Sequence, residues 1–338
     1  MVYGIRGTPL KLIESFLANH FQYVNFNGTK FNHFPVTRGV PQGSTLAPLL
    51  FLIFINDIVN SSSLFHFSLF ADDTCLYLKN PDLVDLYEIC NVELKKVGEW
   101  ILSNGLSLNV DKTVYIIFSG RKKIRNLQTL KIFDKPIVKV EQTKFLGLII
   151  DSKLSWKPHT NFVRGKISRL IGVLYKIGNC LTLDALKTIY HSLLFPHFNY
   201  GIIFWSAVSK TEFLKMFRLQ KKVLRLITKS PKYSHTDPIF KSTRLLKLED
   251  VVHLEMCKFI SVDISTFNNF GFTPRSVIHS YNTRQNSSLN LPIPHNNILL
   301  NSVFYKGIKI YNDLPPAIKN LNDKNKFKET LKSELSKY

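Results

Sequence analysis

The chain has 338 residues, of which 45% are hydrophobic, and its 45 Lys and Arg against 24 Asp and Glu give a net charge of +21. This apolar fraction can bury a sizeable core, which excludes a chain that is disordered over most of its length. The longest apolar run, residues 46–59, is interrupted by Pro48, Asn56 and Asp57 and is shorter than the roughly 18 residues of a membrane span, and no signal peptide precedes it.

Cysteine usage and the distribution of charge further restrict the class of protein to which the chain can belong. The four cysteines have neither zinc-binding nor disulfide spacing, so we expect reduced thiols in an intracellular protein of the nucleus or the cytoplasm. Residues 1–118 carry 8 Lys and Arg and 10 Asp and Glu, whereas residues 119–338 carry 37 and 14. A basic surface on one part of a chain suits a nucleic-acid backbone, the alternative being the generic basic surface of a lysine-rich sequence.

The chain begins with a predicted helix and a predicted hairpin. Apolar residues recur with helical spacing through residues 8–24, and the pair Thr8-Pro9 is a start signal for a helix. Residues 22–27 and 31–37 then alternate around Asn27-Gly28, which predicts a β-hairpin with a tight turn.

A loop rich in Gly, Pro and Gln follows at residues 38–45 and leads into a very apolar helix. Thr45 is the predicted N-cap of this helix, and Pro48 falls in its first turn, where proline is tolerated. The glycines allow the backbone of the loop to approach a nucleotide or a template sugar closely. The Gln42 amide offers such a group both a donor and an acceptor.

Two adjacent carboxylates lie in the most informative stretch of the sequence. Residues 64–69 and 75–78 are apolar, alternating runs that predict paired strands, with Asp72 and Asp73 in the turn between them. Adjacent aspartates repel each other, and a divalent cation bound between their oxygens and substrate phosphates would relieve this repulsion. The alternative is purely structural, because Asp is a common turn residue.

The run Gly39-Val40-Pro41-Gln42-Gly43-Ser44, followed by Phe70-Ala71-Asp72-Asp73, resembles the reverse transcriptase of non-LTR (LINE) retrotransposons, especially the jockey-like ones. The two motifs, their order and their spacing are more specific together than either motif alone. The resemblance implies that Asp72 and Asp73 are catalytic residues that hold Mg²⁺ in a two-metal site. It further implies a nucleotide- and template-binding surface formed by Pro41, Gln42, Gly43, Phe70 and Ala71.

The same resemblance implies that a metal ligand is missing. The polymerase motifs of the family begin with an aspartate on an earlier strand, which holds the two metal ions together with the later pair. The only carboxylates before Asp72 in this chain are Glu14 and Asp57, and neither is predicted on a strand beside the hairpin. We therefore expect an incomplete two-metal site in a fragment that lacks the N-terminal fingers and the first catalytic motif.

Residues 82–103 have the pattern of a long amphipathic helix, which the following Asn-Gly pair ends. Trp100, Asn104 and residues 106–113 reproduce the family pattern Trp-(x)3-Asn-x-Leu-Ser-Leu-Asn-x-x-Lys-Thr. By this resemblance, Lys112 would approach the pyrophosphate leaving group and supply a proton or a positive charge as a catalytic residue. Without the resemblance, Lys112 is an ordinary surface lysine.

Further hairpins are predicted downstream, one pairing residues 129–133 with 139–142 and another within residues 144–151. Within the second hairpin, the sequence resembles the segment that supports the primer end in reverse transcriptases. A buried strand that contains a glycine is a compatible structural interpretation. The primer-grip-like residues are Phe145, Leu146 and Gly147.

Helical periodicity dominates after Trp156, in three segments with apolar stripes. In the first and third segments, basic side chains recur at helical spacing away from the apolar stripe, which resembles the thumb that closes over the duplex being copied. The predicted nucleic-acid-binding residues are Lys166, Arg169 and Lys176 in the first segment and Lys215, Arg218, Lys222, Arg225 and Lys229 in the third.

The sequence thus predicts an α+β fold, with a partial polymerase palm that contains a β-hairpin and helices, a mostly helical thumb and a C-terminal segment. We expect partial fingers and palm in residues 1–118, the end of the palm with its primer-grip-like strands in 119–157, the thumb in 158–232 and a basic C-terminal segment in 233–338. The resemblance implies an RNA-directed DNA polymerase that uses an RNA template, a DNA primer and deoxynucleoside triphosphates. This truncated chain is expected to be inactive alone.

Two alternatives stay open. One is a noncatalytic nucleic-acid-binding protein, either a relic or a domesticated protein, in which Asp72 and Asp73 are vestigial. The other is a group II intron maturase, which shares the palm but is disfavoured by the jockey-like ending near Tyr311-Asn312-Asp313-Leu314-Pro315-Pro316. The oligomeric state does not follow from the sequence.

Overall fold

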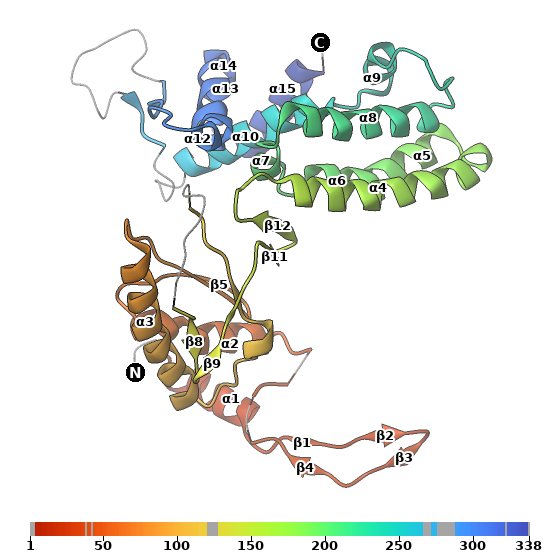
Figure 1. Cartoon of the computed structure of the whole chain (residues 1–338). Coiled ribbons are helices and arrows are strands. Elements are labelled where there is room, and N and C mark those ends of the chain that lie inside the picture. Colours follow the sequence, from red (N-terminus) through yellow and green to blue (C-terminus); the bar gives the residue numbers. More distant parts are fainter. Residues whose placement is uncertain are drawn as a thin grey trace. The chain divides into compact units, whose positions relative to one another are not determined.

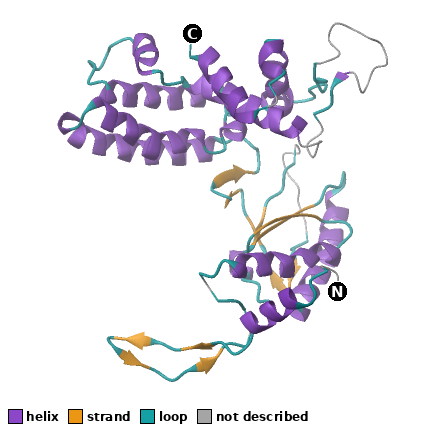
Figure 2. Ribbon diagram, turned by 180° about the vertical axis from the view of Figure 1, so that it is seen from behind, coloured by secondary structure: helices purple, strands orange, loops and turns teal. Residues whose placement is uncertain are grey.

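The computed structural model describes residues 4–37, 39–41, 43–119, 128–265, 272–275, 288–321 and 323–336. Helices and strands are mixed in the described part, as an α+β class requires (Figure 2). The chain forms two compact units. Unit 1 comprises Met1–Tyr115 and Arg121–Val138, and unit 2 comprises Ile116–Gly120 and Lys139–Tyr338.

Unit 1 combines short hairpins with the helices α1, α2 and α3 (Figure 1), of which α2 is strongly apolar and α3 is long and amphipathic. Its elements are α1 (Thr8–Leu17), β1 (Phe21–Gln22), β2 (Asn25–Phe26), β3 (Thr29–Lys30), β4 (Phe34–Pro35), α2 (Leu46–Ile55), η1 (Asn56–Ser61), β5 (His66–Phe70), β6 (Asp73–Tyr77), α3 (Leu83–Ser103), η2 (Val110–Lys112), β7 (Val114–Tyr115), β8 (Lys131–Ile132) and β9 (Lys135–Pro136). The short strand β10 (Val138–Lys139) lies at the boundary between the units.

The first hairpin has the predicted turn. Strands β2 and β3 pair on either side of Asn27 and Gly28, whose φ angles of 50° and 86° are those of a type I′ turn. Strands β1 and β4 continue the same ribbon. The preceding helix is shorter than expected. It ends at Leu17, because Asn19 turns the chain with a φ of 58° and the aromatic sequence from Phe21 forms a strand.

The cap of α2 differs from the prediction. Ser44 Oγ accepts hydrogen bonds from the backbone N–H groups of Leu46 and Ala47, both at 3.1 Å. Thr45, the predicted N-cap, has helical backbone angles and makes no side-chain cap. Helix α2 buries only Ala47 and Ile55 of its ten residues. We call its solvent-exposed apolar side chains, Leu49, Leu52 and Phe54, the α2 face.

Helix α3 confirms the predicted amphipathic pattern. The Asp82 carboxylate accepts from the N–H groups of Val84 and Asp85 and so caps the helix. The predicted face is inside, with Tyr87, Leu94, Val97 and Ile101 among its buried side chains. On the same helix, a Cβ at Gly98 would lie 3.0 Å from the Phe133 ring, so Gly98 permits close packing against the β8–β9 turn.

The predicted pairing of residues 129–133 with 139–142 is wrong. Strand β8 pairs instead with β9, with Lys131 opposite Pro136 and Ile132 opposite Lys135. The two turn residues, Phe133 and Asp134, have φ angles of 51° and 59°. A two-residue turn closes a local hairpin at a lower entropic cost than the longer loop that we expected.

The described part of unit 2 is mostly helical and includes the β11–β12 hairpin (Figures 1 and 2). Its elements are β11 (Gln142–Phe145), β12 (Leu148–Asp151), α4 (Lys157–Ile177), η3 (Gly178–Cys180), α5 (Leu183–Ile189), η4 (Tyr190–Leu194), α6 (Phe195–Asn199), α7 (Ile202–Trp205), α8 (Lys210–Ile227), α9 (Asp237–Thr243), α10 (Leu248–Ser265), α12 (Asn297–Asn301), η5 (Val303–Gly307), α13 (Ile308–Asn312), α14 (Pro316–Lys319) and α15 (Lys324–Leu335).

One hydrophobic core runs through unit 2. Helices α4 and α8 lie side by side, and α10 packs against α7, α13 and α15 (Figure 1). Its largest fully buried side chains include Trp205, Phe198, Phe272 and Phe327. The core includes side chains from both sides of residue 232. The second of the three helical segments expected after Trp156 is interrupted, since the π-helical turn η4 separates α5 from α6.

A buried amide fixes the middle of α8. Gln220 is 1% exposed, and its Nε2 donates to Leu246 O at 2.9 Å and to Tyr190 Oη at 3.1 Å. Its Oε1 accepts from the Leu248 N–H at 2.8 Å. Gln220 therefore ties α8 to η4 and to the segment that leads into α10.

Two further findings concern thiols and membranes. All four cysteines, at positions 75, 90, 180 and 257, are free. In the part of the chain that the structure describes, no helix combines the length and the apolar character needed to cross a lipid bilayer.

Candidate active site

The predicted aspartate hairpin is present. Strands β5 and β6 pair antiparallel, with His66 opposite Tyr77 at one end and Phe70 opposite Asp73 at the other. Ala71 and Asp72 form the two-residue turn, and Ala71 has a φ of 51°. Asp73, which was predicted in the turn, is instead the first residue of β6 and pairs with Phe70. Left-handed backbone at a residue other than glycine costs about 1 kcal/mol or more, so this turn is strained.

One side of the hairpin is packed and its tip is in solvent. Phe65, which precedes β5, is buried, and Phe67, Leu69 and Leu76 are half-buried. Phe70, Ala71, Asp72 and Asp73 are all exposed. The packing of the strands thus presents the two carboxylates to solvent rather than to the core.

A buried carboxylate, which the sequence analysis missed, anchors the start of the hairpin. Ser62 Oγ accepts from the N–H groups of Leu64 and Phe65 at 3.2 and 3.1 Å, and its hydroxyl donates to the Glu93 carboxylate on α3. Lys96 Nζ lies 2.6 Å from Glu93 Oε1. The Lys96 ammonium, followed by the Ser62 hydroxyl, holds the pKa of Glu93 below its usual value. The sequence did contain a signal for this buried carboxylate, because Glu93 is an acidic residue on the apolar face of a predicted helix.

Asp72 and Asp73 match part of a metal site. Carboxylate oxygens are the donors that Mg²⁺ prefers. Among the described residues, however, no three His, Cys, Asp or Glu side chains lie together as a metal-binding group. The hairpin therefore fits a divalent cation as a partial donor set.

Three other predicted catalytic or nucleotide-binding residues, Pro41, Gly43 and Lys112, lie in unit 1 outside the hairpin. Lys112 is exposed at the end of η2, where the Asn109 side chain accepts from its backbone N–H at 3.2 Å. In the described part of the chain, no hydrogen bond or ion pair joins Lys112 to either aspartate. Pro41 is half-buried, and Gly43 is exposed with a φ of 91°. Gln42 lies outside the described residues.

The primer-grip-like residues lie in unit 2, at the turn of the β11–β12 hairpin. Leu146 and Gly147 form this turn with φ angles of 45° and 82°. The Tyr200 hydroxyl donates to Leu146 O, and a Cβ at Gly147 would lie 3.0 Å from the Tyr200 ring. A Cβ at Gly201 would lie 2.6 Å from Leu148. The turn is therefore held closely against the junction of α6 and α7, and Phe145 is half-buried before it.

A buried histidine connects this hairpin to α4. The Ile149 N–H donates to Nδ1 of His159 at 3.3 Å. Burial lowers the pKa of His159 to about 4, so the imidazole is neutral at physiological pH and keeps its acceptor. The Asp151 carboxylate accepts from the N–H groups of Ser155 and Trp156 at the start of the helix.

The predicted cationic residues of α4 are accessible. Lys166 lies over the ring of Phe162, 4.6 Å from its centroid, and is half-buried. Arg169 and Lys176 are exposed. These three side chains are available to an anionic partner.

The predicted cationic stripe of α8 is less uniform than expected. Lys215 forms an ion pair with buried Glu212, with a distance of 2.5 Å between Nζ and Oε1, and Arg225 Nε donates to Ser234 O at 2.9 Å. Lys229 lies beyond the helix and donates to Asn179 O at 3.3 Å. Arg218 and Lys222 are exposed. Periodicity alone did not show which of these cations have protein partners.

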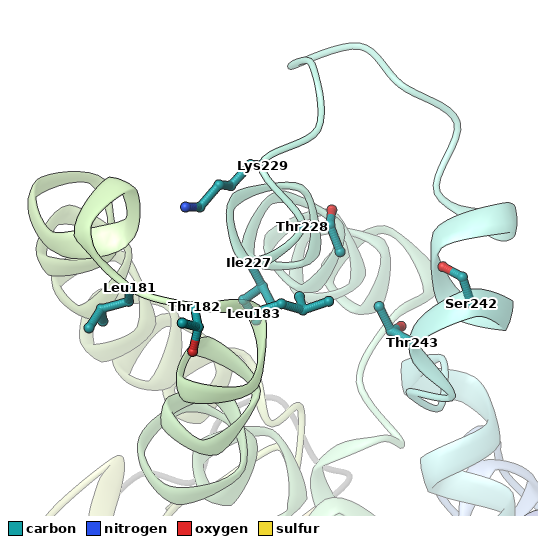
Figure 3. A pocket seen from close by; sticks show the side chains of 8 residues that line it. All are labelled: Leu181, Thr182, Leu183, Ile227, Thr228, Lys229, Ser242 and Thr243. Carbon is teal, nitrogen blue, oxygen red and sulfur yellow. The ribbon is translucent and has the colours of Figure 1, made fainter.

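Unit 2 also contains a pocket of about 430 Å³ (Figure 3). Its lining residues are Leu181, Thr182, Leu183, Ile227, Thr228, Lys229, Ser242 and Thr243. Three of the hydroxyls, those of Thr228, Ser242 and Thr243, bond to carbonyls of their own helices. The pocket has no acid or thiol in its lining and is separate from the predicted site residues except Lys229.

Comparisons with known proteins agree with the resemblance inferred from the motifs. Residues 3–150 match the family described as reverse transcriptase (RNA-dependent DNA polymerase). The chain is 26% identical over 250 residues to the RNA-directed DNA polymerase from mobile element jockey of Drosophila melanogaster, covering 71% of this chain and 27% of that protein. It is 24% identical over 255 residues to the probable RNA-directed DNA polymerase from transposon X-element of the same species, covering 73% and 28%.

A third relative also comes from a retrotransposable element. The Pol polyprotein from type-1 retrotransposable element R1 of Bradysia coprophila is 24% identical over 196 residues, covering 56% of this chain and 20% of that protein. The matched part of the chain thus spans 20% to 28% of the length of these curated relatives.

Proposed function

We propose that this chain, which carries a reverse transcriptase domain over residues 3–150, is a part of the RNA-directed DNA polymerase of a non-LTR retrotransposon. The parent activity is the addition of deoxynucleotides to a DNA primer on an RNA template. The observation that carries the proposal is the solvent-exposed turn that presents Asp72 and Asp73 at the end of a packed hairpin.

We assign residues 1–118 to the partial fingers and palm, 119–157 to the end of the palm with its primer-grip-like strands, 158–232 to the thumb and 233–338 to the basic C-terminal segment. Support for the palm comes from the β5–β6 hairpin packed beside helical elements. Support for the thumb comes from the parallel run of α4 and α8 and from their exposed cations. Such cations give sequence-independent, salt-sensitive affinity for a phosphate backbone.

In this proposal, Asp72 and Asp73 hold divalent cations, of which Mg²⁺ is the expected one. When bound, the cations would lower the pKa of the primer hydroxyl and stabilise the leaving pyrophosphate. The two side chains supply only part of the oxygen donors that such a pair needs. We therefore propose that the chain needs a further carboxylate from an additional polypeptide segment and does not extend primers alone.

The remaining assignments follow the family motifs. Lys112 places a positive charge near the leaving pyrophosphate, where it stabilises developing negative charge. The surface formed by Pro41, Gln42, Gly43, Phe70 and Ala71 contacts the incoming nucleotide and the template. The turn at Leu146 and Gly147 supports the primer end, and its tight contact with Tyr200 gives it the required rigidity.

A noncatalytic nucleic-acid-binding protein is the second candidate function. The observation that favours it is the incomplete group of carboxylates combined with a strongly basic second half. In that case, nucleic acid binds unit 2 while Asp72 and Asp73 have no role.

A primer-extension experiment separates the two functions. The chain would be purified alone and as a fusion to the N-terminal part of a jockey-type polymerase, and each would be incubated with a primed RNA template, deoxynucleotides and Mg²⁺. We expect extension by the fusion only, and its loss in Asp72→Asn. Glu88→Gln, which removes another exposed carboxylate of unit 1, is the matched control and should retain activity.

The outcomes are distinct. Extension by the chain alone, abolished by Asp72→Asn, would show that the site is complete and that the proposed incompleteness is wrong. A folded fusion that binds the primed template without extending it would favour the noncatalytic candidate.

Binding by the thumb is tested separately, by measuring affinity for a duplex at several salt concentrations. Arg218→Glu with Lys222→Glu should weaken binding and flatten the salt dependence by about 0.9 in log–log slope for each lost phosphate contact. The control is Lys326→Glu with Lys328→Glu on α15, which makes the same charge change on exposed residues. Equal losses in both double variants would mean that only net charge matters.

A further inference from the structure

The segment between α8 and α9, residues 228–236, is a hydrogen-bonded loop in unit 2. The Ser230 N–H donates to Arg225 O at 2.9 Å, and the Ser234 N–H donates to Pro231 O at 3.0 Å. Arg225 Nε reaches from α8 to Ser234 O, and Thr236 is buried at the end of the loop. These contacts fix the loop on the helix that carries Arg218 and Lys222.

The loop presents an aromatic ring to solvent. Tyr233 is 85% exposed, the highest value among the described large hydrophobic side chains. Lys232 Nζ lies 5.4 Å from the centroid of this ring. A ring that an ordered loop holds in solvent is not stabilised by burial in the core. Its exposed surface is available to stack on a planar group of a binding partner.

The surroundings of Tyr233 are cationic. Lys229 and Lys232 lie on the same loop, and Lys229 Nζ also donates to Asn179 O at 3.3 Å. The nearest acid along the chain, Asp237, is occupied by Lys247, with Oδ1 and Nζ 3.0 Å apart. The combination of an exposed ring with flanking cations therefore selects a partner that has both planar groups and negative charge.

We propose that Tyr233 stacks on an unpaired base of a single-stranded nucleic acid whose phosphates lie against the cations of this loop. Bases supply planar surfaces, and the backbone supplies the charge that the lysines neutralise. A blunt duplex offers no unpaired base, so the residue would distinguish single-stranded template or overhang from paired product. The inference rests on the proposed nucleic-acid binding of unit 2 and adds a strand preference to it.

Fluorescence anisotropy with the full chain tests this contact. The probes are a labelled 12-nucleotide single-stranded RNA and a blunt RNA–DNA duplex, each measured at several salt concentrations. Tyr233→Ala should weaken single-strand binding by about 5- to 100-fold without changing the salt slope, because stacking does not release counterions. Tyr233→Phe, which keeps the ring, should bind as the unsubstituted chain does.

Two controls separate stacking from other effects. Ile293→Ala removes another highly exposed apolar side chain of unit 2 and should leave affinity unchanged. Lys232→Ala should reduce the salt slope by about 0.7, the value for one contact to a single strand.

Each contrary result has a defined meaning. If Tyr233→Ala binds the single strand within twofold of the unsubstituted chain, the inference is overturned while the proposed function stands. Equal losses on the single strand and the blunt duplex also overturn it. If the unsubstituted chain binds neither probe, both the inference and the proposed nucleic-acid binding fail.

Discussion

Gly201, at the junction of α6 and α7, should not accept a side chain. Its φ is 62°, and a Cβ there would lie 2.6 Å from one methyl group of Leu148 and 3.0 Å from the other. Left-handed backbone costs alanine about 1–2 kcal/mol, of which roughly 0.4–1 kcal/mol is recovered because alanine loses less entropy on folding. Forcing Leu148 aside adds about 1–3 kcal/mol. We expect Gly201→Ala to destabilise unit 2 by about 1–4 kcal/mol.

Gly172 provides a matched control, because alanine at this position is expected to stabilise the protein instead of destabilising it. It lies within α4, and a Cβ there would meet nothing within 4 Å. Because glycine weakens a helix interior, Gly172→Ala should stabilise the protein by about 0.5–1 kcal/mol. Urea unfolding followed by tryptophan fluorescence, in a Trp100→Phe background, would report on Trp156 and Trp205 in unit 2.

A double-mutant cycle identifies the contact. Leu148→Ala removes the methyl groups that the new Cβ would meet, so the combined variant should be more stable than the sum of the single effects by about 1 kcal/mol or more. The reasoning would be refuted if Gly201→Ala were as stable as Gly172→Ala, or if the two substitutions at the junction were additive.

Three further predictions concern single side chains. Gln220→Met should cost about 3–5 kcal/mol, because three buried groups lose their partner, whereas Tyr190→Phe should cost only about 1 kcal/mol; equal urea midpoints would contradict this. Lys215, followed by Arg164, holds the pKa of Glu212 below its usual 4.5, so Glu212 stabilises the fold at neutral pH and this contribution is lost as the pH falls below about 4.5. The difference in urea midpoint between the unsubstituted chain and Glu212→Gln should therefore shrink from pH 7 to pH 3, and a constant difference would argue against the ion pair. Ala71→Gly should raise the free energy of unfolding by about 0.5–1 kcal/mol, because it relieves the strained hairpin turn. Thermal unfolding would measure this change, and a lower unfolding temperature than that of the unsubstituted chain would contradict the prediction.

Local patterns predicted the elements whose energetics are local. The Asn27-Gly28 turn, the β5–β6 hairpin and the amphipathic face of α3 all follow from turn chemistry or from hydrophobic period. The cap of α2 was misplaced by one residue, since both Ser44 and Thr45 have suitable side chains and only the backbone angles decide between them.

Features that depend on tertiary contacts could not be predicted from the sequence. Nothing in the spacing of Lys215 and Arg225 shows that Glu212 and the Ser234 carbonyl engage them. Likewise, Glu93 has the charge of a surface residue, and its burial depends on Ser62, 31 residues earlier. The functional roles of the site residues remain predictions, because they rest on family motifs and on a metal group that one hairpin only partly supplies.

The α2 face has a practical consequence for work in solution. Leu49, Leu52 and Phe54 on α2 are between 42% and 55% exposed. They form an apolar surface on unit 1 through which molecules can associate. The charge that keeps protein molecules apart in solution lies almost entirely in residues 119–338, so it protects this surface poorly. Purified chains should therefore associate more as concentration rises and as salt screens the repulsion between their basic halves. Light scattering across a dilution series would set the concentration range in which affinities and unfolding curves describe single molecules.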